Sequence, residues 1–187
     1  MPMSLEYAIL GFLNYKPLSG YDLKRIFDTS VQHFWPADQS QIYRTLTRLT
    51  ERGWAEMEVV EQSDRPDRKV YHITEAGRAA LHQWLLTPLP PHIPRNADLI
   101  QVFFAGQLSD DEIVAMFERA AERIRSVLKL YEQIPQQAES YREYMESPRE
   151  FFCWMLTLEA GFKSAQANLD WLEDVIRRIK NGEMPAK

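Results

Sequence analysis

The sequence predicts a mainly α-helical protein with one small β-hairpin, arranged as two domains. Apolar residues recur at helical spacing through most of the 187-residue chain and change to β-type alternation only around residues 54–73. Four prolines within residues 88–94 interrupt both patterns, because proline cannot continue a helix or a central strand. We therefore expect an N-terminal domain over residues 1–87, a proline-rich linker over 88–94 and a helical domain over 95–187.

Short-range signals place the first two helices. Apolar residues recur at helical spacing over 5–13, and the chain then reaches Pro17, which predicts the end of a first helix. Ser19 and Asp22 have the spacing of a capping box, in which each side chain satisfies a free backbone N–H of the first turn. A second helix is therefore expected over about 20–27.

A third helix is predicted between Asp38 and Gly53. Asp38 and Gln41 repeat the capping-box spacing, and glycine commonly ends a helix because it accepts a left-handed backbone. Three apolar residues at helical spacing are expected to form the inward face of this helix. They are Ile42, Leu46 and Leu49.

A β-hairpin is predicted directly after the third helix. Residues 54–62 alternate between apolar and acidic side chains, and residues 69–73 form a second β-rich run. The turn-forming residues 63–68 connect the two strands. Thr74 is then expected to cap a fourth helix that reaches about Leu86.

Three more helices are expected beyond the linker. Residues 95–107 have a helical apolar pattern, and capping-box patterns at Ser109 and Ser147 predict the starts of two long helices. Apolar residues then follow at alternating intervals of four and three, over 113–131 in the first long helix and over 151–179 in the second. This spacing is typical of helices that pack against a partner helix.

Three helices followed by a hairpin is the element order of a winged helix-turn-helix domain. In that fold the helix before the hairpin enters the major groove of DNA. Arginine can bond guanine, glutamine can bond adenine, and the threonine methyl group can contact thymine. The outward residues of the third helix are therefore candidates for base contacts. These candidates are Ser40, Gln41, Tyr43, Arg44, Thr47 and Arg48.

The predicted hairpin tip carries basic residues where a wing would reach the DNA backbone or the minor groove. These are Arg65, Arg68 and Lys69, and Asp64 and Asp67 reduce their positive charge. Arginines on one helix face, taken alone, are more often a solvated surface than a binding site. It is their combination with the winged-helix element order that favours a nucleic-acid interface.

The net charge of −5 argues against a nucleic-acid ligand. Residues 1–87 contain 10 basic and 11 acidic side chains (net −1), and residues 88–187 contain 12 and 16 (net −4). The acidity therefore lies mostly in the C-terminal half. A winged-helix module that binds protein instead of DNA remains the alternative.

Three blocks of sequence resemble the PadR family of bacterial transcriptional regulators. They are Leu18–Leu23, Ser40–Gly53 and Lys69–Arg78, and Leu99–Phe104 is similar to the longer, virulence-activator-like members. The resemblance implies a homodimer held by the C-terminal helices, often with the first helix, and DNA contacts from the Tyr43 helix and the wing. Many members have glycine at the position of Ser40 and a more basic wing tip. Members usually repress transcription, and some release DNA on binding an aromatic acid or a drug.

The apolar stripe of the last helix needs a partner, because it would otherwise face water. The helix over 113–131 of the same chain offers a matching stripe. A second chain explains more, since a dimer would also fix the spacing of two recognition helices on DNA. The predicted dimer interface consists of Phe151, Met155, Leu158, Phe162, Leu169, Leu172 and Ile176.

Aromatic residues near the end of the first long helix and the start of the second are candidates for a pocket that binds a small aromatic effector. They are Tyr131, Phe152 and Trp154, and ordinary core packing is the alternative for such a set. Cys153, the only cysteine, is expected to be a buried apolar filler. We predict no metal, no cofactor and no catalytic residue, since no metal-ligand spacing, phosphate-binding glycine loop or nucleophile elbow is present.

Together these observations predict a cytoplasmic, homodimeric regulator, of the repressor type implied by the resemblance, that binds a twofold-symmetric double-stranded DNA operator. No basic leader and no apolar run of about 18 residues is present, so no membrane association is expected. The sequence specifies neither the operator nor the regulated genes.

Overall fold

The computed structural model describes residues 4–32, 34–61, 67–90, 95–139, 142 and 147–185, with the side chains of 136–139 excluded. The chain divides into two compact units. One consists of Met1–Leu89 and Gln136–Phe152, and the other of Pro90–Pro135 and Cys153–Lys187.

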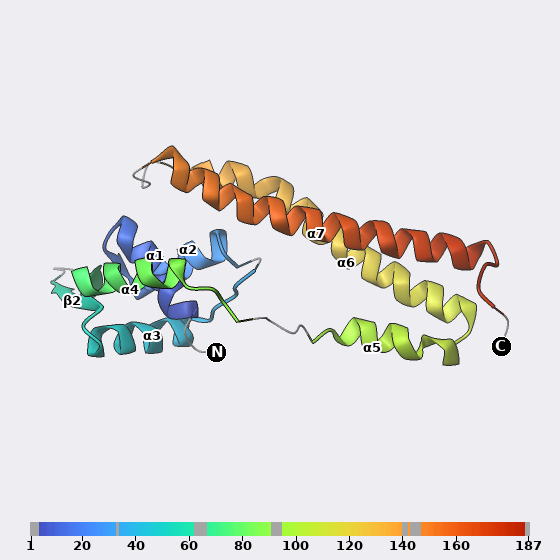
Figure 1. Ribbon diagram of the computed structural model, residues 1–187, viewed down its shortest axis with the longest axis horizontal. Coiled ribbons are helices and arrows are strands. Elements are labelled where there is room, and N and C mark those ends of the chain that lie inside the picture. The colour runs from blue at the N-terminus through green and yellow to red at the C-terminus, as the bar shows by residue number, and fades with distance from the viewer. Residues whose placement is uncertain are drawn as a thin grey trace. The chain divides into compact units, whose positions relative to one another are not determined.

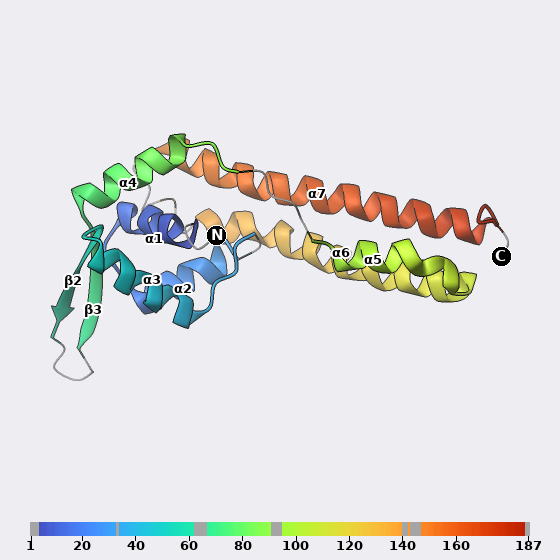
Figure 2. The same ribbon diagram turned by 60° about the horizontal axis from the view of Figure 1, so that its bottom comes forward.

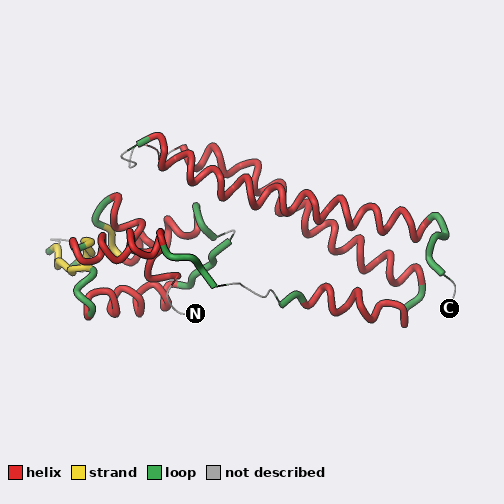
Figure 3. Tube along the Cα trace, in the orientation of Figure 1, coloured by secondary structure: helices red, strands yellow, loops and turns green. Residues whose placement is uncertain are grey.

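The N-terminal part is helical with one small sheet, as predicted (Figures 1 and 3). Its elements, in order, are α1 (Ser4–Tyr15), β1 (Leu18–Ser19), α2 (Gly20–Thr29), α3 (Gln39–Glu51), β2 (Ala55–Val60), β3 (Arg68–Ile73) and α4 (Glu75–Leu86).

Both predicted capping boxes of this part are present. Asp22 N donates to Ser19 Oγ and Ser19 N donates to the Asp22 carboxylate, each at 3.2 Å. At α3, Gln41 N donates to Asp38 Oδ1 at 2.7 Å and Asp38 N donates to Gln41 Oε1 at 3.0 Å. Gly53, at φ +69°, follows the end of α3 in the left-handed region that glycine favours.

Helix α2 is longer than predicted and ends at Thr29 instead of about Phe27. The hydroxyl of Thr29 donates to the carbonyl of Arg25 at 2.9 Å, and the hydroxyl of Ser30 donates to the carbonyl of Ile26 at 2.6 Å. The carbonyl of Ile26 also accepts from the backbone N–H of Ser30 at 2.9 Å, so these hydroxyls add second hydrogen bonds to the last turn.

The helices of this unit surround one apolar core. Ile42, Leu46 and Leu49 of α3 are fully buried, as predicted, and so is Leu23 of α2. Each such side chain contributes roughly 1.5–3 kcal/mol through its removal from water. The core therefore fixes which face of α3 points outward.

The sheet has three antiparallel strands in the order β1-β3-β2, where the sequence predicted two. Strand β1 pairs with β3 at Val70 and Tyr71. The hairpin of β2 and β3 projects away from the helices (Figure 2), and only Ala55 of β2 is buried. The apolar residues of the predicted alternation, Met57 and Val59, are therefore exposed, because no element covers that part of the hairpin.

The C-terminal elements are α5 (Ala97–Phe104), a 3₁₀ turn η1 (Ala105–Gln107), α6 (Asp110–Glu139) and α7 (Pro148–Lys180). The predicted capping box at Ser109 is present, since Glu112 N donates to Ser109 Oγ at 3.3 Å and Ser109 N donates to Glu112 Oε2 at 2.8 Å. Gly182, at φ +73°, follows the end of α7.

Helices α6 and α7 form an antiparallel pair (Figure 1). Two ion pairs fix their register, Arg125 with Glu173 and Lys180 with Glu118, each at 2.7 Å. Apolar residues of the two helices and of η1 form a common core. Its buried members are Ala105, Ile113, Phe117, Ala121, Leu128, Leu169 and Leu172.

Candidate nucleic-acid interface

The outward face of α3 carries most of the predicted base contacts. Five of the six predicted side chains are exposed, and the inward residues of the helix are packed in the core. The exposed five are Ser40, Gln41, Tyr43, Arg44 and Thr47. The geometry therefore presents them together on one surface of the domain.

Arg44 lies next to the start of α3. Its Nε donates to the Ser40 carbonyl oxygen at 3.3 Å and its Nη2 donates to Ser40 Oγ at the same distance. Ser40 Oγ in turn donates to Asp38 Oδ1 at 2.7 Å. This bond and the one from the Gln41 amide lower the pKa of Asp38, so the cap carries a negative charge that partly offsets the positive charge of Arg44.

Tyr43 of α3 packs on the first residue of α2. A Cβ atom at Gly20 would lie 2.5 Å from Tyr43 Cε1, so a larger residue there would displace the Tyr43 ring from this position. Burial raises the pKa of Tyr71 on β3, and Tyr43 adds to this effect, which places both phenols close together. Tyr43 remains 40% exposed and joins α2, α3 and the sheet at one point.

Arg48, the sixth predicted side chain, turns toward α1. Its Nη2 donates to Thr45 Oγ1 at 3.0 Å, and its Nε lies 3.3 Å from Oε1 of Glu6. This Nε is buried and its approach to Glu6 lacks hydrogen-bond geometry, so the contact is an ion pair. Arg52 donates to the other oxygen of Glu6 at 2.7 Å. The buried carboxylate of Glu6 was not predicted as a functional residue.

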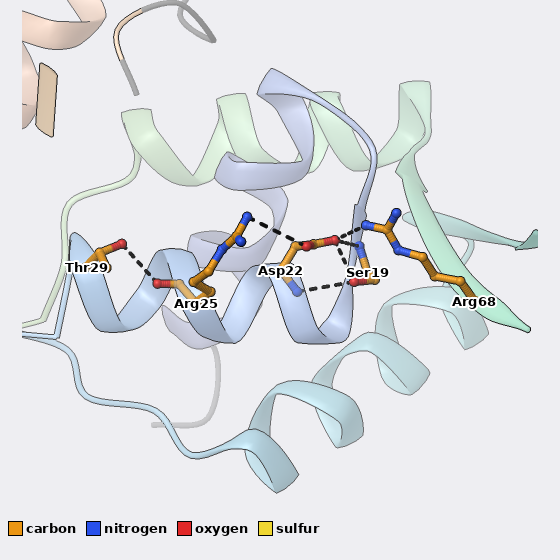
Figure 4. A network of polar contacts seen from close by, with 5 residues as sticks. All are labelled: Ser19, Asp22, Arg25, Thr29 and Arg68. Carbon is orange, nitrogen blue, oxygen red and sulfur yellow. Dashed lines mark hydrogen bonds and ion pairs between the residues drawn. The ribbon is translucent and has the colours of Figure 1, made fainter. Parts of the chain in front are cut away.

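The predicted wing residues differ in their environment. Arg68 donates to the carboxylate of Asp22, as Figure 4 shows, whereas Lys69 is exposed. Arg65 lies outside the described residues. Among the described residues no carboxylate lies within ion-pair distance of Lys69 or Arg44, although the more distant Asp38 partly offsets the charge of Arg44.

Asp22 is the centre of this polar network. Its Oδ2 accepts from Ser19 Oγ at 2.6 Å and from Arg68, and its Oδ1 lies 4.0 Å from Arg25 (Figure 4). Burial opposes ionisation, but the hydrogen bonds from Ser19 and Arg68 outweigh it and lower the pKa of Asp22. The network connects the start of β3 in the wing to the N-terminus of α2.

The residues predicted for the dimer interface fall into two groups. Leu158, Leu169 and Leu172 are buried within the chain, and the last two belong to the core between α6 and α7. Phe162 is 38% exposed. The remaining members, Phe151, Met155 and Ile176, are half-buried. The single chain thus already provides the intramolecular partner for part of the stripe.

The residues predicted for an effector pocket are not equivalent either. Tyr131 is buried against Gly161, where an added Cβ would lie 3.2 Å from its ring, and Phe152 is 63% exposed. Trp154 is half-buried. The prediction that Cys153 is buried is wrong, because the residue lies on the side of α7 away from the apolar stripe and is exposed.

The C-terminal unit has a groove of about 720 Å³ between α5, α6 and α7. The T-shaped ring pair of Phe117 and Trp171, with centroids 5.6 Å apart, lies along it. Its charged lining is mixed, since Arg119 and Arg123 lie with Asp98 and Glu112, and Arg123 pairs with Asp98 at 3.6 Å. None of the three predicted effector residues lines this groove.

Over the described part of the chain, no group of three or more His, Cys, Asp or Glu side chains is arranged to hold a metal ion. None of the helices described is both long enough and apolar enough to cross a membrane.

Both halves of the chain match known families. Residues 9–83 match the model of the Transcriptional regulator PadR-like family, and residues 94–180 match the Virulence activator alpha C-term model. The Mycobacterium tuberculosis protein Rv1176c, named a probable transcriptional regulator, is 33% identical over 95% of this chain and 98% of its own. The chain belongs to the PadR-like family of transcriptional regulators.

Solved structures of this family agree with the fold. Bacillus subtilis PadR in complex with operator DNA has a TM-score of 0.80 at 30% identity and covers 94% of this chain and 98% of its own. The same PadR in complex with p-coumaric acid has a TM-score of 0.77 at 29% identity, covering 94% and 95%. The Vibrio cholerae virulence activator AphA has a TM-score of 0.71 at 25% identity, covering 95% and 99%. The predicted family and fold class are therefore confirmed.

Proposed function

We propose that this PadR-like protein is a sequence-specific transcriptional repressor that binds a twofold-symmetric DNA operator as a homodimer. The observation that carries the proposal is the outward face of α3, where Tyr43, Arg44 and neighbouring polar side chains are presented together. Recognition helices of this fold place such side chains against base edges in the major groove. The relative solved with operator DNA covers nearly the whole chain, which supports the same use of this face.

Within this proposal, residues 1–87 form the DNA-binding domain, 88–94 the linker and 95–187 the dimerisation domain. Arg44, Gln41 and Thr47 have the chemistry to contact bases, and Ser40 supports Arg44. Tyr43 lies at the junction of α2 with α3 and can contact either a base or the backbone. The basic residues of the wing would contact phosphates or the minor groove. These are Arg65, Arg68 and Lys69.

Arg48 is a weaker candidate for a base contact in the structure than it is in the sequence. Its guanidinium group is held by Glu6 and Thr45, so it reaches DNA only if it gives up one of these contacts. We therefore rank Arg44 above Arg48 as a base contact.

Dimerisation through α7 is supported by the apolar side chains that the single chain leaves uncovered. Phe162 and, elsewhere on the same helix, Leu156 are 38% and 44% exposed. Exposed apolar surface of this kind commonly marks an interface. The proposed interface retains Phe151, Met155, Leu158, Phe162, Leu169, Leu172 and Ile176, with the exposed and half-buried members in direct contact with the second chain.

Repression and a small aromatic effector are supported by the relatives. The Bacillus subtilis relative, 28% identical over 94% of this chain, is named a negative transcriptional regulator, and its complex with p-coumaric acid has been solved. For this chain Tyr131, Phe152 and Trp154 are the candidate effector contacts. We propose that the protein acts on DNA in the cytoplasm and catalyses no reaction.

The decisive experiment measures binding of the purified protein to the DNA upstream of its own gene and to an unrelated duplex of equal length. Both titrations are made at two salt concentrations. We expect tighter binding to the upstream DNA and a steep loss of affinity with salt, because phosphate contacts release counterions. Absence of binding to either duplex at low salt would favour the alternative, a winged-helix module that binds protein. That alternative is suggested by the net charge of −1 over residues 1–87, which contain 10 basic and 11 acidic side chains.

Addition of p-coumaric acid to the DNA complex tests the effector. Release of the upstream DNA would support an aromatic effector, and a reporter gene placed behind the same DNA would distinguish repression from activation.

A further inference from the structure

Two carboxylates hold three arginines, of which Arg48 and Arg68 belong to the proposed DNA interface and Arg52 directly follows α3. Glu6 is only 2% exposed, and its two oxygens face the guanidinium groups of Arg48 in α3 and of Arg52 at the C-cap of α3. Asp22 holds Arg68, the first residue of β3, at the end of the wing that adjoins its turn (Figure 4). Each arginine is itself between 43% and 47% exposed in its side chain, so each lies at the protein surface with one side toward a carboxylate.

The two pairings are stable arrangements and not chance surface contacts. An exposed ion pair contributes little, but a buried carboxylate that loses its cation is left uncompensated at a cost of several kcal/mol. Glu6 lies inside the domain, and the guanidinium of Arg52 also lies over the ring of Trp54, 5.2 Å from its centroid. Asp22 is fixed by its capping bonds with Ser19. Both carboxylates therefore stay in place and compete with any phosphate for these arginines.

We propose that Glu6 and Asp22 determine specificity by holding Arg48, Arg52 and Arg68 against the domain and so limiting how many phosphates the protein neutralises. This inference rests on the proposed DNA-binding function. Phosphates are present on every sequence, so an arginine that is free to contact them raises the affinity for all DNA. Holding it back lowers non-specific binding more than operator binding, which also depends on base contacts.

The remaining cations show the contrast. Arg44 and Lys69 have no carboxylate within ion-pair distance among the described residues, and Arg44 is oriented by the hydroxyl and carbonyl of Ser40. The domain thus presents two cations without a direct carboxylate partner, Arg44 and Lys69, beside three arginines that each pair with a carboxylate. This arrangement also explains how a domain with a net charge of −1, from 10 basic and 11 acidic side chains, can present a locally positive surface.

The test uses the full-length variants Glu6→Gln and Asp22→Asn, which keep the shape and a hydrogen-bond acceptor but remove the charge. Affinity for an unrelated duplex is measured over a series of salt concentrations. Each arginine released to a phosphate steepens the slope of log K against log salt by about 0.9. We expect a steeper slope by up to about 1.8 for Glu6→Gln and about 0.9 for Asp22→Asn, with tighter non-specific binding and a smaller ratio of operator to non-specific affinity.

Two controls separate release of the arginines from simple loss of a negative charge. Glu51→Gln removes an exposed carboxylate from the last turn of α3 without breaking either pairing. Glu6→Gln is also introduced into a variant that carries Arg48→Ala and Arg52→Ala. In the wild-type background, the gain in non-specific affinity from Glu6→Gln should exceed the gain from Glu51→Gln. In the background that lacks both arginines, the gain from Glu6→Gln should disappear. A gain of equal size in all three contexts would overturn the inference.

Thermal unfolding followed by circular dichroism shows whether each variant is folded. If the carboxylates had only a structural role, their replacement would lower DNA binding and not raise it. If Glu6→Gln does not fold, Asp22→Asn carries the test, with Arg68→Ala as its background. Wild-type binding that is salt-sensitive, together with unchanged slopes in both variants, would overturn the inference and leave the proposed function intact. Failure of the wild type and of both variants to bind any duplex would overturn both.

Discussion

Gly77 in the first turn of α4 lies against the backbone that leaves α3. A Cβ atom at this position would be 2.1 Å from the carbonyl oxygen of Trp54, which also accepts from Thr74 N at 3.1 Å. Because a hydrogen-bonded backbone carbonyl cannot move aside cheaply, we expect Gly77→Ala to lower the free energy of unfolding by about 1–3 kcal/mol. Urea unfolding of the purified variant measures this loss.

Gly11 on α1 provides the matched control for that substitution. No atom lies within 4 Å of a Cβ built there, so Gly11→Ala should be neutral or stabilise the helix by up to about 1 kcal/mol. Equal shifts of the unfolding midpoint for both variants would contradict the argument, since the two changes are chemically identical and differ only in the space around them.

Asp22 should make the stability of the N-terminal domain depend on pH. Burial opposes its ionisation, but the bonds from Ser19 and Arg68 lower its pKa in the folded state. A carboxyl group with a lowered pKa stabilises the fold fully above the unfolded-state value of about 3.9 and loses this contribution as the pH falls through the folded-state pKa. We expect wild type to exceed Asp22→Asn by about 1 kcal/mol in the free energy of unfolding at pH 7. That difference should shrink as the pH is lowered below 3.8.

Urea unfolding of both proteins between pH 7 and pH 3 checks this expectation. A difference that stays constant or grows toward acid pH would mean that Asp22 contributes through packing and not through its charge.

At the scale of elements, α3 and the wing are expected to contribute differently to DNA binding. Arg44 projects from the outward face of α3, so Arg44→Ala should weaken operator binding by about 1–3 kcal/mol, or roughly fivefold to 150-fold, with little effect on an unrelated duplex. Lys69 lies at the wing, and Lys69→Ala should weaken both duplexes alike and reduce the salt slope by about 1. Fluorescence anisotropy titrations against both duplexes measure these effects. A uniform loss for Arg44→Ala would reassign that residue to a phosphate.

The element boundaries could be predicted because their signals are local. Ser19, Asp38 and Ser109 cap their helices within three residues of sequence, and Gly53 follows α3. The apolar periodicity likewise identified the buried apolar residues of α3, although not the buried Thr45. Local patterns of this kind need no knowledge of the rest of the fold.

Features that depend on distant parts of the chain could not be predicted in this way. Strand β1 has two residues, too few for an alternation, and exists because β3 pairs with it. Arg48 was assigned to the outward face by its position on the helix, but Glu6, 42 residues earlier, draws its guanidinium toward α1. The pairing of Arg68 with Asp22 crosses 46 residues. Charge compensation of the candidate site is thus a tertiary property.

At the scale of the molecule, the apolar residues of α7 have two possible partners, α6 of the same chain and a second copy of the chain. Leu169 and Leu172 are 7% and 4% exposed in a core shared with α6, so the antiparallel pair already buries that part of the stripe. Toward the start of α7, Leu156 and Phe162 remain more than a third exposed. The intramolecular and intermolecular explanations are therefore compatible, since different stretches and sides of one helix can serve each.

Phe162 should accordingly control dimerisation without being required for folding of the chain. It is 38% exposed and lies outside the core between α6 and α7, so Phe162→Glu places a charge in the proposed interface while it leaves the single-chain core intact. We expect sedimentation equilibrium to show a wild-type dimer and a variant that dissociates at least tenfold more readily, because an unpaired charge buried in an interface costs more than 1.4 kcal/mol. Ala167→Glu introduces the same charge at an exposed position of the same helix and should leave the dimer unchanged. If Phe162→Glu remains a dimer with unaltered stability, the second chain binds another face. The exposed apolar side chains of α5, such as Phe103 at 81%, would then be the next surface to alter, because exposed apolar surface of this kind commonly marks an interface.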